Sequence, residues 1–482
     1  MTPTPPVQPN DPGPPEPELP FHVPPSTLAT MRADGSRIKV HPADVKGRWL
    51  TWRRIVFAVL VAFYVLMPLV KIGGKPAIQL EVSTRRFYLF GETFNAQDFW
   101  MVLLLALAFV FGLLAVTAWR GRVWCGWACP QTVFLEGVYR PIERFLEGGR
   151  EQRLKLDAAP WTAKKVALRL AKYTVFLFVS LNIAHAAAAI FVGPREFLDM
   201  IVEGPSKHVE AFFLVMGFTG ILMFNFTWFR EQFCVVLCPY GRLQSVLHDK
   251  DSVTVSYFEQ RGEPRGRLAK GAGQPRGDCV DCNRCVAVCP TGIDIRNGLQ
   301  MECLACLQCI DACDDVMTKV KKPTGLIGFA SHNELLGKKR KIVRPRLMVY
   351  TAITGLALTT LGVSLVTRTP FESNVIRTKG SNPFIVDGEV VRNPFEIHLV
   401  NKNPEPSTFH VSISGPVAID AVIGTPDVEL ASLANTRVPV VVSIKKELVT
   451  GPLELTIEIT DSRSGTVKKQ PLKFLSPMSV GR

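Results

Sequence analysis

The sequence predicts a multidomain protein in which a five-helix α-helical membrane bundle carries a cysteine-rich insertion and is followed by a C-terminal all-β domain. Three observations support this prediction: five long apolar runs, twelve cysteines in spaced motifs, and a change to short β-branched segments from about Val375 onward. With 482 residues and 47% hydrophobic content, the chain is not a small disulfide scaffold, a disordered protein or a single soluble domain.

The first segment, residues 1–45, is predicted to be a disordered, Pro-rich tail. Residues 1–25 contain eleven prolines and almost no apolar run, so they cannot bury enough surface to offset the entropy lost on ordering. No basic segment followed by an apolar core begins the chain, and a cleaved signal peptide is therefore not expected.

Five apolar runs are long enough to cross a hydrocarbon core of about 30 Å. They are Ile55–Val70, Phe99–Trp119, Tyr173–Val192, Ala211–Phe229 and Leu347–Val366. The first run is short, and Trp52 before it indicates anchoring at the membrane interface. Residues 46–229 are thus expected to hold transmembrane helices 1–4, and residues 347–366 helix 5.

The distribution of Lys and Arg predicts the orientation. Seven precede helix 1, eleven lie between helices 2 and 3 and six lie just before helix 5, whereas the other two short loops hold four and two. Basic loops stay inside, so the N-terminus, the loop of residues 120–172 and residues 230–346 are expected in the cytoplasm, and residues 370–482 in the periplasm of a bacterial inner membrane. The same bias explains the net charge of +14 without nucleic-acid binding.

The C-terminal segment is predicted to be an immunoglobulin-like sandwich. Short β-branched runs alternate with Asn, Pro, Gly and Asp; examples are Phe395–Val400, Thr408–Ser414, Val438–Ile444 and Leu453–Ile459. About seven such strands fit this fold. The segment contains no cysteine, and a docking or spacer role is expected.

The twelve cysteines all lie on the side predicted to be cytoplasmic, where structural disulfides are disfavoured. Metal ligation or redox chemistry is therefore expected. Eight of them form two adjacent C-x2-C-x2-C-x3-C motifs, a spacing in which three thiolates bind one iron-sulfur cube and the fourth binds its neighbour. The motifs are Cys279, Cys282, Cys285 and Cys289, then Cys303, Cys306, Cys309 and Cys313.

This spacing predicts two 4Fe-4S clusters with exchanged fourth ligands in a ferredoxin-like domain at about residues 270–320. Cluster 1 takes Cys279, Cys282, Cys285 and Cys313, and cluster 2 takes Cys303, Cys306, Cys309 and Cys289. Paired zinc knuckles are the alternative, but these need only two pairs of ligands and usually a longer spacer. Asp314 stands where the ferredoxin pattern has proline, a departure that removes no ligand.

The remaining four cysteines form a second repeat, C-x3-C-P. The motifs are Cys125, Cys129 and Pro130 after helix 2, and Cys234, Cys238 and Pro239 after helix 4. Cysteines four residues apart on a helical turn point to one face, and the proline then stops or redirects the turn. Soft thiolates select Cu(I), zinc or iron-sulfur species, so the two pairs are candidates for a copper or redox site. The alternative is that they are small buried residues at helix ends.

His185 lies inside helix 3, close to Asn182. An ionisable residue within a membrane segment is a functional hypothesis by default. A hydrogen bond across the bundle is the simpler expectation, and ligation of haem or copper is the alternative.

The chain resembles the FixG/CcoG family of cytochrome c oxidase accessory proteins. The resemblance is carried by the C-x3-C-P pairs, the cysteine run Gly277–Met317, the following Gly325-Leu326-Ile327 and the late membrane helix before a β-domain, and it covers roughly residues 45–480. It implies an inner-membrane, ferredoxin-like reductase that helps to mature the copper centre of a cbb-type oxidase by reducing Cu(II) to Cu(I). Copper would then pass to other assembly factors.

Three functions are compatible with these features. The first is the cupric reductase, and the second is a quinol-linked electron-transfer subunit that feeds a periplasmic reductase. The third is a non-redox metal chaperone or assembly scaffold. The β-domain and the absence of other redox motifs favour the first. The expected partners are then the membrane, copper, other oxidase assembly factors and an electron donor, which no sequence motif identifies.

Overall fold

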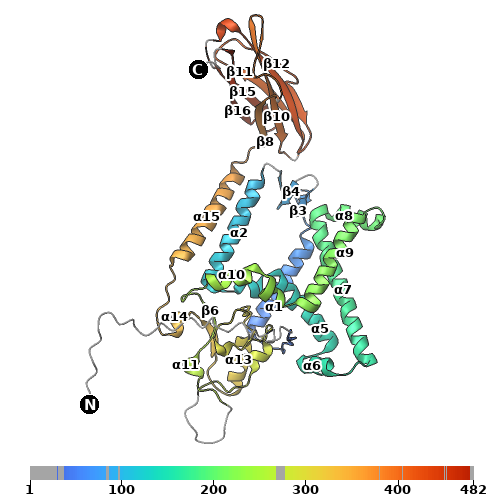
Figure 1. Cartoon of the computed structure of the whole chain (residues 1–482), viewed down its shortest axis with the longest axis vertical. Helices are drawn as coiled ribbons and strands as arrows, with labels where there is room; N and C mark the ends of the chain where they lie inside the picture. Colours follow the sequence, from blue (N-terminus) through green and yellow to red (C-terminus); the bar gives the residue numbers. More distant parts are fainter. Residues whose placement is uncertain are drawn as a thin grey trace, which may run out of the picture. The chain divides into compact units, whose positions relative to one another are not determined.

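The computed structural model describes residue 30 and residues 37–82, 86–95, 98–266, 277–378, 380–403, 405–449, 451 and 453–477. The chain forms two compact units, and Figure 1 labels most of their helices and strands. One unit consists of residues 1–92 and 102–359, and the other of residues 93–101 and 360–482.

Five helices among the described residues are long and apolar enough to cross a membrane, which confirms the predicted number. They are α1 (Arg48–Leu66), α2 (Phe99–Arg120), α7 (Ala163–Val192), α9 (Val209–Phe224) with its π-helical continuation η4 (Asn225–Phe229), and α15 (Pro345–Val366). The first helix begins and ends earlier than the run Ile55–Val70, so that Trp52 lies inside it and Met67 and Pro68 lie beyond it.

Helices α7 and α9 pack around a short π-helix, η3 (Leu135–Tyr139). The ring of Tyr139 stacks on Phe226, and its hydroxyl lies 2.7 Å from that of Ser180. Phe176 meets the same ring edge-on. These buried contacts fix the third and fourth membrane helices against the segment that connects the second to the third.

That connecting segment is largely helical, although the sequence indicated only a basic loop. Its elements are α3 (Val123–Trp127), α4 (Pro130–Phe134), η3, α5 (Arg140–Glu147) and α6 (Arg150–Ala158). Many of its charged side chains are buried because they pair with one another. The basic residues therefore also form part of a folded core.

The segments after α1 and α7 contain short elements that the sequence did not predict. They are β1 (Lys71–Ile72), β2 (Lys75–Pro76), β3 (Ile78–Glu81), β4 (Arg86–Leu89), β5 (Glu92–Phe94) and α8 (Pro194–Glu203). Strands β3 and β4 pair antiparallel, with Leu80 opposite Phe87.

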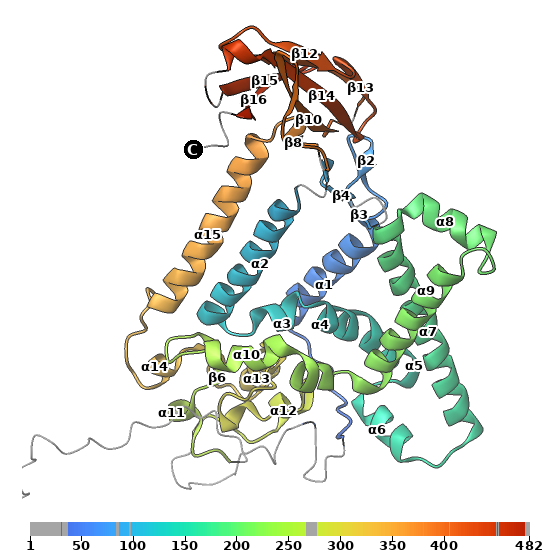
Figure 2. The ribbon, with the colours of Figure 1, turned by 45° about the horizontal axis from the view of Figure 1, so that its top comes forward.

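The cysteine-rich segment forms a compact group of short elements at one end of α1 and α9 (Figure 2). They are η5 (Phe233–Leu237), α10 (Pro239–Leu247), β6 (Thr254–Tyr257), α11 (Glu259–Gly262), α12 (Arg284–Val288), η6 (Ile295–Asn297), α13 (Gln308–Lys319), β7 (Ile327–Ala330) and α14 (His332–Leu335). Strands β6 and β7 pair antiparallel, and the buried side chains of Ile295, Ile310 and Leu326 pack around the cysteines.

The C-terminal part is an all-β sandwich, as predicted. Its elements are β8 (Phe371–Arg377), β9 (Ile385–Asp387), β10 (Val390–Asn401), β11 (Ser407–Ser414), β12 (Asp420–Ile423), β13 (Asp427–Leu430), β14 (Asn435–Lys445), η7 (Lys446–Leu448), β15 (Leu453–Asp461) and β16 (Val467–Phe474). One sheet has the order β12-β14-β10-β8 with β9 also paired to β10, and the other has the order β13-β11-β15-β16. In β15, Leu455, Ile457 and Ile459 face the core between the sheets, which is the period-2 pattern that predicted the strand.

The N-terminal tail is packed over its last part, contrary to the prediction of disorder up to residue 45. The Ala43 amide donates to the Ala287 carbonyl at 2.7 Å, and Arg153 donates to the Pro42 carbonyl at 2.9 Å. Ala43 and Val45 join a small buried cluster with Val288 of α12. These small apolar residues follow the proline-rich part, and residues 1–29 and 31–36 lie outside the described residues.

Candidate metal centres

The two four-cysteine motifs fold as the same kind of turn, each leading from a loop into α12 or α13. Asp281 and Asn283 in the first motif have φ angles of 49° and 54°, and Ala305 and Leu307 at the equivalent positions of the second have 50° and 65°. A left-handed backbone at residues other than glycine is strained, and it turns successive N–H groups into an anion-binding concavity. The repeated geometry therefore suits two sites that bind negatively charged groups.

The last cysteine of the second motif lies beside the first motif. Burial raises the pKa of Cys313 to about 12, and the thiols of Cys285, Cys282 and Cys279 add to that shift. Three cysteines of one motif and the fourth of the other are thus close enough to interact.

The last cysteine of the first motif lies beside the second motif. Burial raises the pKa of Cys303 to about 11 and that of Cys306 to about 12, and Cys289 adds to both shifts. The same three residues and Cys309 line a small cavity, which Cys285 also reaches. Four thiols around one largely apolar cavity are a donor set that fits a 4Fe-4S cluster.

All twelve cysteines are free thiols. Cys279, Cys285, Cys306 and Cys313 are buried, whereas Cys282 is exposed. Within the described ranges, no group of three or more His, Cys, Asp or Glu side chains is arranged to hold a single metal ion. Thiolates that share an iron-sulfur cube bind different irons, so they stand farther apart than the ligands of one zinc ion.

The departure from the ferredoxin pattern at Asp314 has a structural reason. Cys313 and Asp314 lie inside α13, where a proline would remove a helical hydrogen bond and clash with the preceding turn. The Asp314 carboxylate accepts a hydrogen bond from the Gly325 amide at 2.8 Å. Aspartate at this position therefore keeps α13 continuous and ties it to the loop before β7.

The two C-x3-C-P motifs share one local structure. In each, the first cysteine lies in a short helical turn, α3 or η5, and the proline begins the next helix, α4 or α10. Cys129 and Cys238 between them are extended, with φ and ψ of −62° and 125°, and −69° and 113°. Proline is preorganised for the first helical position, so it redirects the chain into a new helix.

The four thiols of these motifs lie near enough to one another to affect each other's pKa, although within the described residues no three of them are arranged to hold one metal ion. Burial raises the pKa of Cys125 to about 12, and Cys129 and Cys238 contribute in the same direction. Burial also raises the pKa of Cys234, as do the thiols of the other three. We refer to Cys125, Cys129, Cys234 and Cys238 as the thiol quartet.

Arg122 and a close backbone contact connect the two halves of the thiol quartet. Arg122, just before α3, donates to the Gly241 carbonyl of α10 at 2.6 Å and to the Gln244 side chain. The Gln244 Oε1 atom lies 3.8 Å from the Cys125 Sγ atom. Gly241 must be glycine, because a Cβ atom there would lie 2.5 Å from the Cys234 carbonyl oxygen.

The first C-x3-C-P motif rests directly on the loop between Cys303 and Cys306. A Cβ atom at Gly126 would lie 2.3 Å from the Leu304 carbonyl oxygen, so only glycine permits this approach. Trp127 Nε1 donates to the Ala305 carbonyl at 3.3 Å. The thiol quartet and the second four-cysteine motif are therefore neighbours.

Sequence reasoning missed a cluster of buried charges that joins α5, α7 and the residue after η4. Arg230, directly after η4, donates to both carboxylate oxygens of Glu143, with Nη1 and Oε2 3.0 Å apart. Lys172 Nζ lies 3.8 Å from the Glu143 carboxylate and 2.9 Å from that of Glu147. The one signal in the sequence was the helical spacing of Glu143 and Glu147 with Arg140 and Arg144 in α5.

His185 makes its hydrogen bond within its own helix rather than across the bundle. Its Nδ1 atom lies 2.7 Å from the Leu181 carbonyl, and its ring meets Phe197 edge-on. These contacts give the imidazole a structural role in α7.

Three family models match the chain. The "4Fe-4S dicluster domain" model matches residues 229–332, and the "4Fe-4S binding domain" model matches residues 102–148. The "IG-like fold at C-terminal of FixG" model matches residues 361–477, in agreement with the predicted sandwich. The two iron-sulfur models together include both four-cysteine motifs and the thiol quartet.

Curated relatives match over most of their length. The nitrogen fixation protein FixG of Rhizobium meliloti (strain 1021) is 34% identical over 432 residues, which are 80% of this chain and 82% of that protein. Protein RdxA of Cereibacter sphaeroides is 34% identical over 83% of this chain and 87% of its own, and protein RdxB of the same organism is 35% identical over 78% and 82%.

The buried charges predict an acid-sensitive fold. Burial alone would raise the pKa of Glu143, but Arg230, Lys172 and Arg140 outweigh it and hold the pKa at about 2, below the ordinary 4.5. The stability from this carboxylate is therefore complete above about pH 4.5 and is lost as the pH falls toward 2. Glu143→Gln should lose this pH dependence and, by leaving Arg230 buried without its partner, cost roughly 3–5 kcal/mol at pH 7.

The measurement is the unfolding midpoint of the detergent-solubilised chain between pH 7 and pH 3. Glu203→Gln is the matched control, because Glu203 pairs with Lys207 and His208 on an exposed surface and should change stability by about 0.5 kcal/mol or less. Equal stability of wild type and Glu143→Gln at pH 7 would contradict the account.

Proposed function

This chain belongs to the FixG family, and from that premise we propose that it reduces Cu(II) to Cu(I) for assembly of the copper centre of a cbb-type cytochrome c oxidase. Its family models and relatives make it an iron-sulfur electron-transfer protein with membrane helices. The observation that carries the finer proposal is the contact of Gly126 and Trp127 with the loop between Cys303 and Cys306. Through this contact the C-x3-C-P motif of Cys125 and Cys129 lies next to the second four-cysteine motif.

The eight cysteines of the paired motifs are the proposed cluster ligands, with exchanged fourth ligands. The proximity of Cys313 to the first motif and the cavity shared by Cys289 and the second motif support the exchange. Such clusters, when bound, accept and donate one electron at a time. The surrounding chain supplies left-handed turns and apolar walls that hold the thiolates in place.

The thiol quartet is the proposed site of the copper substrate. Reduction adds one electron to Cu(II) and changes no covalent bond of the protein. Thiolates prefer Cu(I) to Cu(II), so a site that binds the product through sulfur makes the reduction more favourable. Arg122 and the Gly241 contact hold the two C-x3-C-P turns against each other, which supports this proposal.

The proposed topology places the N-terminus, both four-cysteine motifs and the thiol quartet in the cytoplasm and the immunoglobulin-like sandwich in the periplasm of the inner membrane. The support is the Lys and Arg distribution over the five helices. In the cytoplasm the thiols would stay reduced and available for metal binding.

If each cluster takes its fourth ligand from the other motif, replacing that ligand should damage the cluster of the other motif. Anaerobically purified protein should hold about eight iron and eight sulfide per chain. Cys289→Ser should damage mainly the cluster of the second motif, and Cys313→Ser mainly the cluster of the first, as measured by electron paramagnetic resonance of the reduced variants. Loss of the first-motif cluster in Cys289→Ser, with the other intact, would disprove the exchange.

The topology is tested with two fused reporters. An alkaline phosphatase that is active only outside the cytoplasm should be active when fused after Arg482 and inactive when inserted near Gly273, because the positive-inside bias orients the five helices. A green fluorescent protein that does not fold in the periplasm should give the reverse pattern. Phosphatase activity at Gly273 would place the cysteines outside and refute the proposed orientation.

The copper site is tested by the double variant Cys125→Ser and Cys234→Ser. It should keep nearly all of its iron but lose thiolate-dependent Cu(I) binding and the reduction of Cu(II) by the dithionite-reduced protein. Val236→Ser is the control, because Val236 lies in the same motif and is exposed, and it should behave as wild type.

Two other results of this experiment speak against the proposal. Full Cu(II) reduction by the double variant would leave the thiol quartet with a structural role only. Loss of iron in the double variant would mean that the quartet holds a further iron-sulfur cluster. This alternative is suggested by the "4Fe-4S binding domain" model, which matches residues 102–148 and so includes Cys125 and Cys129.

A further inference from the structure

Arg53 is a buried cation at the place where α1 meets the second four-cysteine motif. Its side chain is only 1% exposed. Gln308 lies inside that motif, between Cys306 and Cys309. With its amide turned so that both of its groups are satisfied, Gln308 accepts a hydrogen bond from Arg53 Nη1 at 2.7 Å and donates one to the Val288 carbonyl at 3.0 Å. The guanidinium of Arg53 is therefore in direct contact with the second motif.

We propose that Arg53 raises the reduction potential of the cluster held by the second motif and so keeps this buried cluster reducible. The inference rests on the cluster ligands proposed above. Reduction adds one electron, and hence one negative charge, to the cluster, and no covalent bond forms or breaks. A fixed positive charge close by stabilises the reduced form more than the oxidised form, so the potential rises.

Burial makes the second motif an unfavourable place for additional negative charge. Leu307 within the motif and Ile310 directly after Cys309 are buried, and Cys306 is buried between other parts of the chain. A charge that is removed from water is destabilised. Net charge and solvent exposure are among the factors that set the potential of an iron-sulfur cluster. A cation at this position thus offsets the effect of burial on the potential.

The thiol of Cys306 shows how Arg53 acts on a negative charge in the second motif. Burial raises the pKa of Cys306 to about 12, and Arg53 opposes that rise because it stabilises the thiolate. Among the charged groups that act on this thiol, Arg53 has the largest effect. The same attraction acts on the electron added to a cluster that Cys306 ligates.

Arg53 belongs to a group of largely buried charges in which one positive charge is in excess. Among the described residues, three guanidiniums share two carboxylates, and the members of the group are Arg37, Arg53, Arg140, Glu136 and Glu231. Arg53 lies 3.9 Å from Glu136, which pairs with Arg140 as well. An excess charge in the interior is costly unless an opposite charge lies beside it. A cluster bound by thiolates in the second motif supplies that opposite charge.

One nitrogen atom of Arg53 has no partner within the part of the chain that the structure describes. Nε donates to the Gly126 carbonyl at 2.8 Å and Nη1 donates to Gln308, whereas Nη2 is buried without a hydrogen bond. A buried donor that stays unpaired is destabilising. The guanidinium therefore suits a negatively charged group that the described chain does not itself supply.

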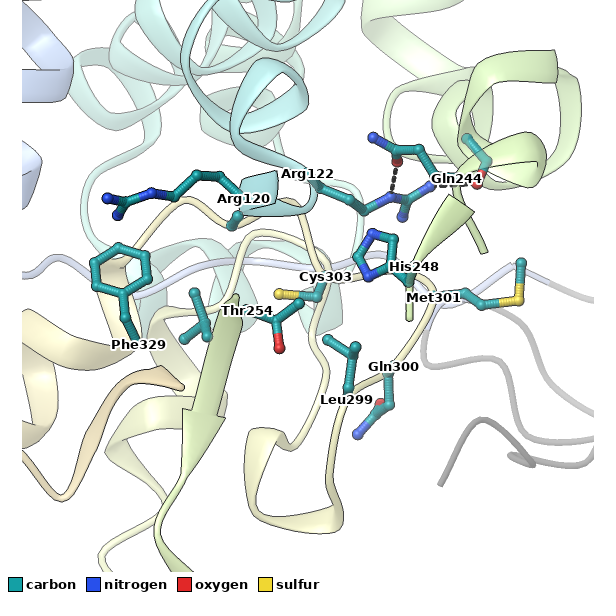
Figure 3. Close-up of a pocket in the computed structure, with 13 residues that line it drawn as sticks. Arg120, Arg122, Gln244, His248, Thr254, Leu299, Gln300, Met301, Cys303 and Phe329 are labelled. Carbon is teal, nitrogen blue, oxygen red and sulfur yellow. Dashed lines mark hydrogen bonds between the residues drawn. The ribbon is translucent and has the colours of Figure 1, made fainter. Parts of the chain in front are cut away.

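Arg122 also lies near the second motif, but its hydrogen bonds are directed to α10. Figure 3 shows its bond to Gln244, and it donates to the Gly241 carbonyl at 2.6 Å as well. Burial raises the pKa of Cys303, and the Ala305 amide opposes this rise more strongly than Arg122 does. Arg53 is therefore the cation whose replacement tests the proposal most directly.

The position of the second motif gives the charge of Arg53 a role in electron transfer. Gly126 and Trp127 contact the loop between Cys303 and Cys306, so a cluster of the second motif lies next to the first C-x3-C-P motif. By stabilising the reduced form of this cluster, Arg53 favours the presence of an electron beside the proposed copper site.

The test measures the midpoint potentials of both clusters in the full-length protein, purified anaerobically in detergent. Dithionite titrations are followed by electron paramagnetic resonance, and Cys306→Ser identifies the signal of the second-motif cluster. Arg53→Met removes the charge, whereas Arg53→Lys keeps the charge but loses the planar guanidinium. Arg54→Met is the matched control, because it removes the same charge from the next residue, which is exposed. Glu136→Gln removes the carboxylate that partly balances Arg53.

Arg53→Met should lower the equilibrium constant for reduction of the second-motif cluster at least about tenfold, which is a fall of about 59 mV for a one-electron couple. The potential of the other cluster should stay near its wild-type value. Arg53→Lys should remain close to wild type, and so should Arg54→Met, because water screens an exposed charge. Glu136→Gln should shift the potential of the second-motif cluster upward.

An unchanged potential in Arg53→Met overturns the proposal. Equal shifts in Arg53→Met and Arg53→Lys also overturn it, since the effect would then be structural, and so does an equal shift in Arg54→Met. If Arg53→Met holds no iron, Glu136→Gln decides, and a potential that does not rise in that variant overturns the proposal.

The potentials are measured without copper. Iron-loaded wild type that does not reduce Cu(II) would therefore refute the cupric reductase alone, and the titrations would still decide the role of Arg53. Wild-type protein without a cluster in the second motif would refute both proposals.

Discussion

The arrangement of the cysteines depends on one buried guanidinium, that of Arg53 in α1. Its Nε atom donates to the Gly126 carbonyl at 2.8 Å, which fixes the turn between Cys125 and Cys129. Its side chain is only 1% exposed, and its charge opposes the effect of burial on the pKa of Cys306. A single residue of the first membrane helix thus contacts one C-x3-C-P turn and faces a proposed cluster ligand.

A buried arginine is costly unless its charge is compensated, and the fold supplies compensation from distant parts of the chain. Glu136 of η3 lies 3.9 Å from Arg53, and Arg140 pairs with the same carboxylate. Arg140 also donates to the Pro290 carbonyl at 3.1 Å, directly after Cys289. Arg53, Glu136 and Arg140 are therefore linked to one another, and through backbone carbonyls they contact both a C-x3-C-P motif and a four-cysteine motif.

The sequence predicted the features that local spacing determines. The four-cysteine motifs, the C-x3-C-P turns and the five apolar helices each depend on residues within one short window, and the strands of the sandwich follow a period of two. The helices between residues 120 and 158 were missed, because their charged residues are stabilised by partners far away in the chain, such as Arg230 for Glu143. The packing of residues 37–45 was missed for the same reason, since Ala43 depends on Ala287.

The two C-x3-C-P motifs show the same difference between local features, which the sequence predicted, and long-range contacts, which it did not. Each motif was evident in the sequence, and their convergence was a hypothesis from the repeat alone. The geometry that brings them together depends on Arg122 and on Gly241, neither of which carries a recognisable signal. The close approach of Gly126 to Leu304 likewise depends on the absence of a side chain, which a single sequence does not reveal as a contact.

The central claim is that the ferredoxin-type motifs and the thiol quartet form one path that delivers electrons to copper. The most direct test mixes fully reduced, donor-free protein with Cu(II) under anaerobic conditions and counts Cu(I) with a chromogenic chelator while the visible spectrum follows the clusters. We predict about two Cu(I) per chain, one for each one-electron cluster, formed at the rate at which the clusters are oxidised. Clusters that stay reduced in the presence of Cu(II), or Cu(I) that forms without their oxidation, would contradict the account.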